Sequence, residues 1–212
     1  MKITAISSQK RNNNRVNISI DGEYRFSLDL YQVVDLGIKI GKEYSDSDLI
    51  AFETESQFGK IYGRALEYCL VRPRSSREMR DYLNRKTRPT VDKNGFKKPG
   101  VPPDVTCRVF DRLVDKKYID DYKFAKYWID NRSVRKGVSK VKLNAELRQK
   151  GIDSITIDQI FSESERSDGQ EIKKIIAKKR QKYPDERKMI EYLARQGFRY
   201  DDIKTALQED GY

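Results

Sequence analysis

Basic side chains gather at two places in this sequence where they could bind an anion. The first group is Arg72, Arg74 and Arg77, and the second surrounds Gly137. The members of the second group are Arg132, Arg135, Lys136, Lys140 and Lys142. Arginine presents a planar fork of donors that fits phosphate or carboxylate, and lysine presents a compact positive charge. We interpret both groups as candidate contacts to an external anion; a solvated basic face is the alternative for each.

The first group lies where a helix is expected to begin, because Ser75 and Glu78 have the spacing of a capping box. The helix macrodipole disfavours cations at that end. Arginines concentrated there therefore indicate an anionic partner rather than a contribution to helix stability. A third basic run, KKIIAKKRQK at 173–182, is interpreted as the solvated face of a helix.

Aromatic residues precede the second basic group, between Tyr118 and Trp128. They could stack on nucleic-acid bases. Phe124 and Trp128, however, recur at helical spacing, which favours the interior of a helical unit for both.

Side chains suited to catalysis or metal binding are scarce. The chain has no histidine, and its two cysteines, Cys69 and Cys107, are expected to be buried free thiols. The adjacent carboxylates Asp120 and Asp121 are expected to cap a helix rather than bind a metal. Phosphate-binding and dinucleotide-binding glycine motifs are missing from the sequence. We therefore expect no enzyme activity, no cofactor and no metal site.

Charge and hydropathy set the class of protein. The net charge of +11 and the pI of about 9.5 favour an anionic partner. Residues 60–120 contribute most of it, with 16 basic and 8 acidic side chains. No apolar run approaches the ~20 residues that cross a bilayer, and the first residues lack the apolar core of a secretory signal. A cytoplasmic protein with no membrane contact is expected.

Residues 1–44 carry the signals of a small β-rich unit. Val16, Ile18 and Ile20 alternate with polar residues, Asp21–Gly22 supplies a two-residue turn, and the alternation resumes at 24–28. This pattern predicts a β-hairpin. A turn is expected at 11–14, a short helix over 30–36, and another short strand over 38–40.

The remainder reads as amphipathic helices arranged in a repeat. Three helices have similar sequences, with Met79, Leu143 or Met189 followed four residues later by Leu83, Leu147 or Leu193. Each of these helices has another helix before it and another after it. The pattern predicts three units of three helices: a first repeat over 45–119, a middle repeat over 120–166 and a third repeat over 167–212. The first repeat is longer because of residues 87–103, which are rich in Pro, Gly and Lys and are expected to form an exposed loop.

Five short motifs resemble a known family. They are Tyr62-x-x-Ala65-Leu66, Arg72-x-Arg74-Ser75, Asp121-x-x-Phe124-Ala125-x-x-Trp128-x-x-x-Arg132, Lys136-Gly137, and Glu146-Leu147-x-x-Lys150-Gly151-Ile152. Together they resemble the RecX family of recombination regulators over about residues 60–165. The resemblance implies tandem three-helix units, binding to the RecA–DNA filament, and inhibition or destabilisation of that filament in recombination and the SOS response.

The expected fold is therefore mainly α, with tandem three-helix repeats of helix-turn-helix type after a small β-rich unit. The expected partners are a RecA-type recombinase filament and single- or double-stranded DNA, contacted directly or indirectly by a monomer. The sequence departs from the family at Lys117, where glycine is usual, at Met79, where leucine is usual, and at the 87–103 insertion. A direct DNA-binding protein of helix-turn-helix type remains the alternative.

Overall fold

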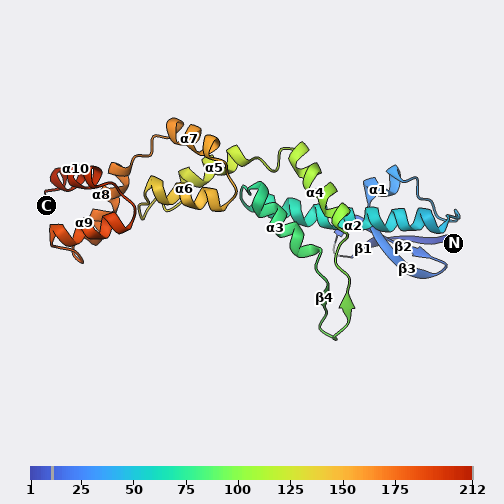
Figure 1. Ribbon diagram of the computed structural model, residues 1–212. Helices are drawn as coiled ribbons and strands as arrows, with labels where there is room; N and C mark the ends of the chain where they lie inside the picture. The colour runs from blue at the N-terminus through green and yellow to red at the C-terminus, as the bar shows by residue number, and fades with distance from the viewer. Residues whose placement is uncertain (11, 212) are drawn as a thin grey trace. The chain divides into compact units, whose positions relative to one another are not determined.

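The computed structural model describes residues 1–10 and 12–211 and is mainly α-helical (Figure 1). Its contacts divide the chain into two compact units. The N-terminal unit comprises Met1–Arg72 and Met79–Tyr118, and the C-terminal unit comprises Pro73–Glu78 and Ile119–Tyr212. This division into two units does not test the predicted limits of the β-rich unit and of the three repeats, which remain predictions.

The predicted β-hairpin at the start of the chain is confirmed. Strands β1 (Ile3–Gln9), β2 (Asn12–Ile20) and β3 (Glu23–Asp29) form an antiparallel sheet in that order. Val16 pairs with Leu28 and Ile18 with Phe26 across the turn at Asp21–Gly22. Two local predictions were wrong: Asn12–Asn14 lie in β2 rather than in a turn, and residues 38–40 form no strand. Residue 11, the first of the predicted turn, lies outside the described residues.

One face of this sheet is closed by the next helices of the chain. Helix α1 (Leu30–Asp35) is short, and α2 (Asp46–Val71) is a single helix of 26 residues. Leu49 and Phe52 of α2 join the buried strand residues in one hydrophobic core, which also takes in Ile38. Ser45 starts α2 with a capping box that Asp48 completes. The first half of α2 therefore stabilises the β-sheet.

The helices that follow α2 carry an exposed hairpin between them. Helix α3 (Ser76–Lys86) leads into strands β4 (Thr90–Val91) and β5 (Lys97–Lys98), and α4 (Pro103–Asp115) follows and contacts α2. The predicted loop at 87–103 is exposed, but its centre is an antiparallel two-stranded ribbon that stands out from α3 and α4 (Figure 1).

The C-terminal unit contains two groups of three helices. The first group is α5 (Asp121–Asn131), α6 (Lys140–Gln149) and α7 (Ser154–Glu163), and the second is α8 (Asp168–Lys179), α9 (Glu186–Arg195) and α10 (Tyr200–Glu209). Each group has its own hydrophobic core. Leu83, Leu147 and Leu193 are all buried, as are the residues four positions before them, Met79, Leu143 and Met189. The tandem three-helix fold is confirmed.

A serine hydroxyl recurs at the same position of successive repeats. Ser75 donates to the main-chain carbonyl of Lys150 at 2.8 Å, and Ser139 donates to the carbonyl of Gln196 at 2.7 Å. Both serines are fully buried. The carbonyls lie at the C-terminal ends of α6 and α9, where a helix leaves its last acceptors without a partner. Each serine therefore satisfies the helix end of the following repeat.

A second hydrogen bond accompanies each of these serines. The main-chain N–H of Ser76 donates to Asp121 at 2.7 Å, and that of Lys140 donates to Asp168 at 2.9 Å. Both aspartates are the first residue of a helix, so each also suits the helix macrodipole there. The neighbouring Asp120 caps α5 by accepting from the N–H of Lys123, as predicted. The paired carboxylates are therefore structural.

Two side chains expected in the interior are more accessible than predicted. Cys107 is exposed, whereas Cys69 is buried. Trp128 is half-buried, with its ring 5.6 Å from that of Phe124, which has no exposed surface. The indole N–H of Trp128 donates to Glu146 at 2.9 Å. Trp128 thus packs against Phe124 at the edge of the middle repeat's core, while its indole N–H bonds to the Glu146 carboxylate.

Candidate nucleic-acid interface

A basic groove lies between the two groups of three helices in the C-terminal unit. Its volume is about 560 Å³. Its charged side chains are Arg132, Lys136, Lys142, Lys178, Lys179 and Glu146, so five cations face one carboxylate. Tyr192 and Phe198 add aromatic surface. Three of the predicted contact residues, Arg132, Lys136 and Lys142, are brought together here.

Gly137 places the basic turn against helix α8. Its φ of +78° belongs to the left-handed region that glycine adopts at no cost. A Cβ at this position would lie 2.6 Å from the main-chain oxygen of Glu171 and 2.6 Å from the side chain of Ile175. The next residue, Val138, donates its N–H to the Glu171 carboxylate at 3.0 Å. The absence of a side chain at 137 therefore lets the turn reach α8.

The anchor on α8 is itself a buried charged group. Glu171 is 1% exposed and accepts from Arg166 at 2.9 Å and from Lys174 at 2.6 Å. Burial alone would raise the pKa of this carboxyl, but the hydrogen bonds from Arg166 and Lys174 outweigh it and the pKa is lowered. Glu171 is thus an ionised acceptor that holds the turn by the N–H of Val138.

Helices α8 and α9 supply the groove residues that the sequence did not single out. Lys178 and Lys179 come from α8, and Lys178 donates to the main-chain oxygen of Arg135. Tyr192 comes from α9 and stacks on Tyr183, with 4.8 Å between ring centres. The lysine run is visible in the sequence, where its pattern predicts a solvated face. Its approach to the turn depends on the packing at Gly137, which no local pattern reveals.

Some groove cations already have partners within the protein. Arg132 forms a two-pronged contact with Glu146, at 2.9 and 3.1 Å, and this hydrogen bonding raises the pKa of Arg132. Its guanidinium lies 5.6 Å from the Trp128 ring centre. Lys142 donates to the Gln196 side chain. Arg132 and Lys142 are thus held in place, and Lys136 lies exposed beside them.

Lys140 and Arg135 lie outside the lining of the groove. Lys140 borders a separate shallow hollow with Arg148 and Phe161, and its ammonium is 5.8 Å from the Phe161 ring centre. Arg135 is exposed, and its main-chain oxygen, rather than its guanidinium, meets Lys178. The two residues could extend a basic surface beyond the groove.

The arginine group at 72–77 does not form one exposed patch. Arg74 is buried, with 9% of its surface exposed, while Arg77 is exposed and Arg72 is half-buried. Treating Arg74 as an external contact therefore needs correction, because a buried guanidinium is held by groups of its own protein. Arg77 is the member of the group best placed to reach a partner.

Another hollow of about 450 Å³ lies beside Glu171, but its charges are mixed. Its charged lining comprises Lys126, Arg166 and Lys174 together with Asp130, Glu163, Glu165 and Glu171. The basic groove is therefore the stronger candidate for binding a polyanion.

Over residues 1–10 and 12–211, no cluster of three or more His, Cys, Asp or Glu side chains could hold a metal ion. In the same part of the chain, no helix is both long and apolar enough to cross a membrane.

Comparison with known proteins gives concordant results. Two family models match the chain: the N-terminal domain of the regulatory protein RecX over residues 1–45, and the second three-helix domain of RecX over residues 120–160. The second match contains α5, α6 and the basic turn between them.

Full-length relatives support the same assignment. The regulatory proteins RecX of Bacillus licheniformis and Bacillus subtilis are each 33% identical over 99% of this chain, which corresponds to 78% and 77% of their own lengths. That of Clostridium tetani is 30% identical over 98% of this chain and 94% of its own. A crystal structure of regulatory protein RecX superposes with a TM-score of 0.72 at 22% identity, covering 98% of both chains.

Proposed function

Because the chain belongs to the RecX family of regulatory proteins, we propose that it binds the RecA–DNA filament and inhibits or destabilises it. In this role it modulates recombination and the SOS response. It acts as a cytoplasmic monomer, without a cofactor and without catalysing a reaction. The partner is the recombinase filament, and DNA phosphates are contacted either directly or through the filament surface.

The observation that carries the proposal is the basic groove. Five cations converge there from the turn at 132–137, from α6 and from α8. Arg132 and Lys142 are positioned by Glu146 and Gln196 before any partner arrives. Groups that are already ordered lose little side-chain freedom on binding, which favours affinity. A DNA backbone or an acidic protein surface supplies the complementary charge.

Strand exchange by the cognate recombinase tests the proposal. Adding this protein at stoichiometric amounts is expected to inhibit exchange and to shorten or cap the filaments seen by electron microscopy. The double variant Lys178→Ala/Lys179→Ala is expected to bind filaments on the order of tenfold more weakly, since exposed ion pairs contribute ~0.2–1 kcal/mol each.

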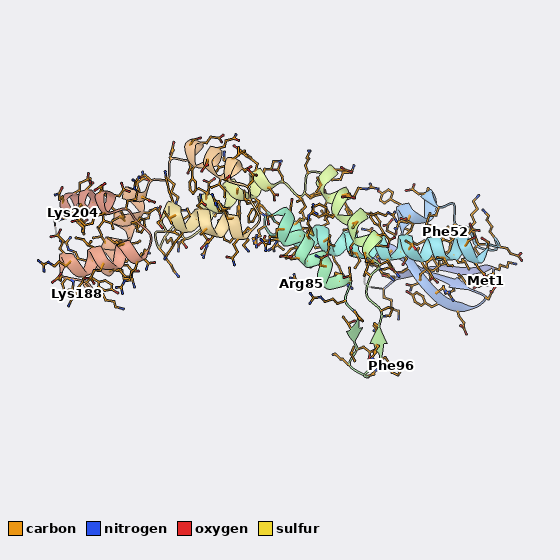
Figure 2. The ribbon with its side chains drawn as sticks, in the orientation of Figure 1. Met1, Phe52, Arg85, Phe96, Lys188 and Lys204 are labelled. Atoms are coloured by element: carbon orange, nitrogen blue, oxygen red, sulfur yellow. The ribbon has the colours of Figure 1, made fainter. Side chains whose placement is uncertain are left out.

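The matched control is Lys188→Ala/Lys204→Ala. These two lysines belong to α9 and α10 of the same unit (Figure 2) and do not line the groove, and their removal changes the net charge equally. Equal losses for both double variants would show that only net charge matters. Normal strand exchange in the presence of the wild-type protein, with no binding to filaments, would refute the proposal.

The helix-turn-helix alternative makes a different prediction. It requires a recognition helix that reaches base edges, and in the middle repeat that helix would be α7. Helix α7 carries no lysine or arginine, whereas the groove cations come from the turn, α6 and α8. Under the alternative, naked duplex DNA binds tightly with a salt slope of about −4 to −5 for five phosphate contacts. Weak binding to naked duplex DNA combined with strong binding to filaments excludes it.

A further inference from the structure

The hairpin at 87–101 is a second basic element, separate from the groove and absent from the function proposed above. Strands β4 and β5 pair Thr90 with Lys98 and Val91 with Lys97. Its cations are Arg88, Lys93, Lys97 and Lys98, against the single carboxylate of Asp92. All four cations are exposed. The charge of this ribbon is complementary to a polyanion.

The hairpin is well defined although it is exposed. The Asp92 carboxylate accepts from the N–H groups of Asn94 and Phe96, at 2.9 and 3.0 Å, and the N–H of Asp92 donates to the carbonyl of Phe96 at 3.0 Å. The N–H of Phe96 is the main cause of a lowered pKa for Asp92, so its carboxylate remains ionised at the turn. The role of Asp92 is therefore to hold the turn of the hairpin in one conformation through these hydrogen bonds.

The neck of the hairpin is closed by the main chain. Val101 donates its N–H to the carbonyl of Lys86 at 2.9 Å, and a Cβ at Gly100 would lie 1.8 Å from the carbonyl oxygen of Thr87. Only glycine permits so close an approach of the two legs. The ribbon is thus presented from the end of α3 on a narrow, defined base.

Protection against aggregation explains some of this composition. Lysine and proline on short strands prevent a sheet edge from pairing with another chain, and Pro89 and Pro99 flank the two strands. That explanation does not cover Phe96. Its side chain is 68% exposed near the end of the hairpin, where Figure 2 labels it. Exposing an aromatic ring in this way forgoes the stabilisation that burial of its apolar surface would contribute.

We propose that this hairpin binds single-stranded nucleic acid, with the Phe96 ring stacking on an unpaired base and Lys93, Lys97 and Lys98 contacting the adjacent phosphates. An aromatic platform with flanking cations is the combination by which proteins hold single strands without reading their sequence. Insertion into a duplex would in addition require neighbouring base pairs to unstack. The proposal is independent of the filament activity, because it concerns naked single strands.

The test uses the full-length chain and a mixed-sequence single-stranded DNA of about 30 nucleotides. Phe96→Ala is expected to weaken binding about tenfold, the low-to-middle range for loss of one stacked base. The matched control is Val91→Ala, which removes another exposed apolar side chain (64% exposed) from the same ribbon and is expected to leave the affinity unchanged. Both variants should keep the thermal midpoint of the wild type.

A local reporter separates the hairpin from the rest of the basic surface. Phe96→Trp is expected to preserve affinity, and fluorescence of the introduced indole should be quenched when the strand is added. Trp128 is the only native tryptophan, so the wild-type chain provides the background signal. Lys97→Ala/Lys98→Ala should reduce the salt slope by about 1.4, at ~0.7 per phosphate contact on a single strand.

Two results would overturn the inference. One is equal affinity of Phe96→Ala and Val91→Ala for the single strand, together with no quenching in Phe96→Trp. The other is a larger loss on the matching duplex than on the single strand, which would assign the ring to duplex insertion. Failure here leaves the filament experiment unaffected, because that experiment varies Lys178 and Lys179 and measures strand exchange.

Discussion

The hydroxyl of Ser139 donates a 2.7 Å hydrogen bond to the main-chain carbonyl of Gln196, at the end of a helix in the following repeat. The same hydroxyl accepts from the N–H of Lys142 and so caps α6. Ser75 has the equivalent bonds, to Lys150 and from Glu78. One small side chain thus begins a helix in its own repeat and completes a helix in the next.

Ser139→Ala is therefore expected to destabilise the C-terminal unit by ~1–3 kcal/mol, because it leaves the carbonyl of Gln196 without its buried donor and removes a helix cap. Urea unfolding followed by circular dichroism measures the change. Ser167→Ala is the control: Ser167 caps α8 from an exposed position by its bond with Gln170, and its loss should be smaller. Equal costs for the two serines would contradict the role given to the Gln196 bond.

Glu171 gives the C-terminal unit an acid-sensitive element. Its folded-state pKa is lowered, so its stabilising contribution is present above the unfolded value of ~4.3 and is lost as the pH falls through the folded value. Glu171→Gln is expected to cost about 3 kcal/mol at pH 7, because Arg166 loses its buried partner. The difference between variant and wild type should shrink as the pH falls below about 4.

The exposed pair of Lys173 and Glu209 provides the control for this prediction. Both side chains are 54% exposed, so Glu209→Gln should change the free energy of unfolding by no more than ~0.5 kcal/mol. Denaturant midpoints measured from pH 3 to pH 8 distinguish the two variants. A pH profile for Glu171→Gln that runs parallel to the wild type would show that Glu171 is not the titrating group.

Substitutions of Trp128 separate its packing from its hydrogen bond. Trp128→Ala is expected to destabilise the middle repeat by about 3 kcal/mol, the lower end of the range for core aromatic deletions, since the ring is half-buried. Trp128→Phe keeps the contact with Phe124 and loses the bond to Glu146, so about 1 kcal/mol is expected. Thermal unfolding gives both values. An unchanged midpoint for Trp128→Ala would show that the ring contributes no packing.

The arginines at 74 and 77 are expected to respond differently to truncation. Arg74→Ala should lower stability by ~1–3 kcal/mol because the side chain is buried and has partners within the protein. Arg77→Ala should change the free energy of unfolding by less than ~0.5 kcal/mol. If Arg77 contacts the partner, this variant should instead bind filaments more weakly. Parallel unfolding and binding measurements test both. A stable Arg74→Ala variant with impaired binding would restore Arg74 as a contact residue.

The sequence by itself determined the features that depend on neighbouring residues. Alternating Val16, Ile18 and Ile20 predicted the first hairpin, and the spacing of Leu83, Leu147 and Leu193 predicted the tandem helices. Asp120 was predicted as a cap. Each of these follows from a period or a cap that a few consecutive residues define. The overall positive charge is also a property of composition.

Only the tertiary structure decided which of the basic residues meet. Arg74 and Arg77 are three positions apart, yet one is buried and the other exposed. Lys178 joins Lys136 because Gly137 allows a turn to approach α8, 34 residues further along the chain. Contacts between distant segments depend on packing and steric fit. The local charge pattern does not predict them. The groove is therefore a product of the fold, which joins the predicted contact residues Arg132, Lys136 and Lys142 to Lys178 and Lys179, two lysines that the local pattern assigns to solvent.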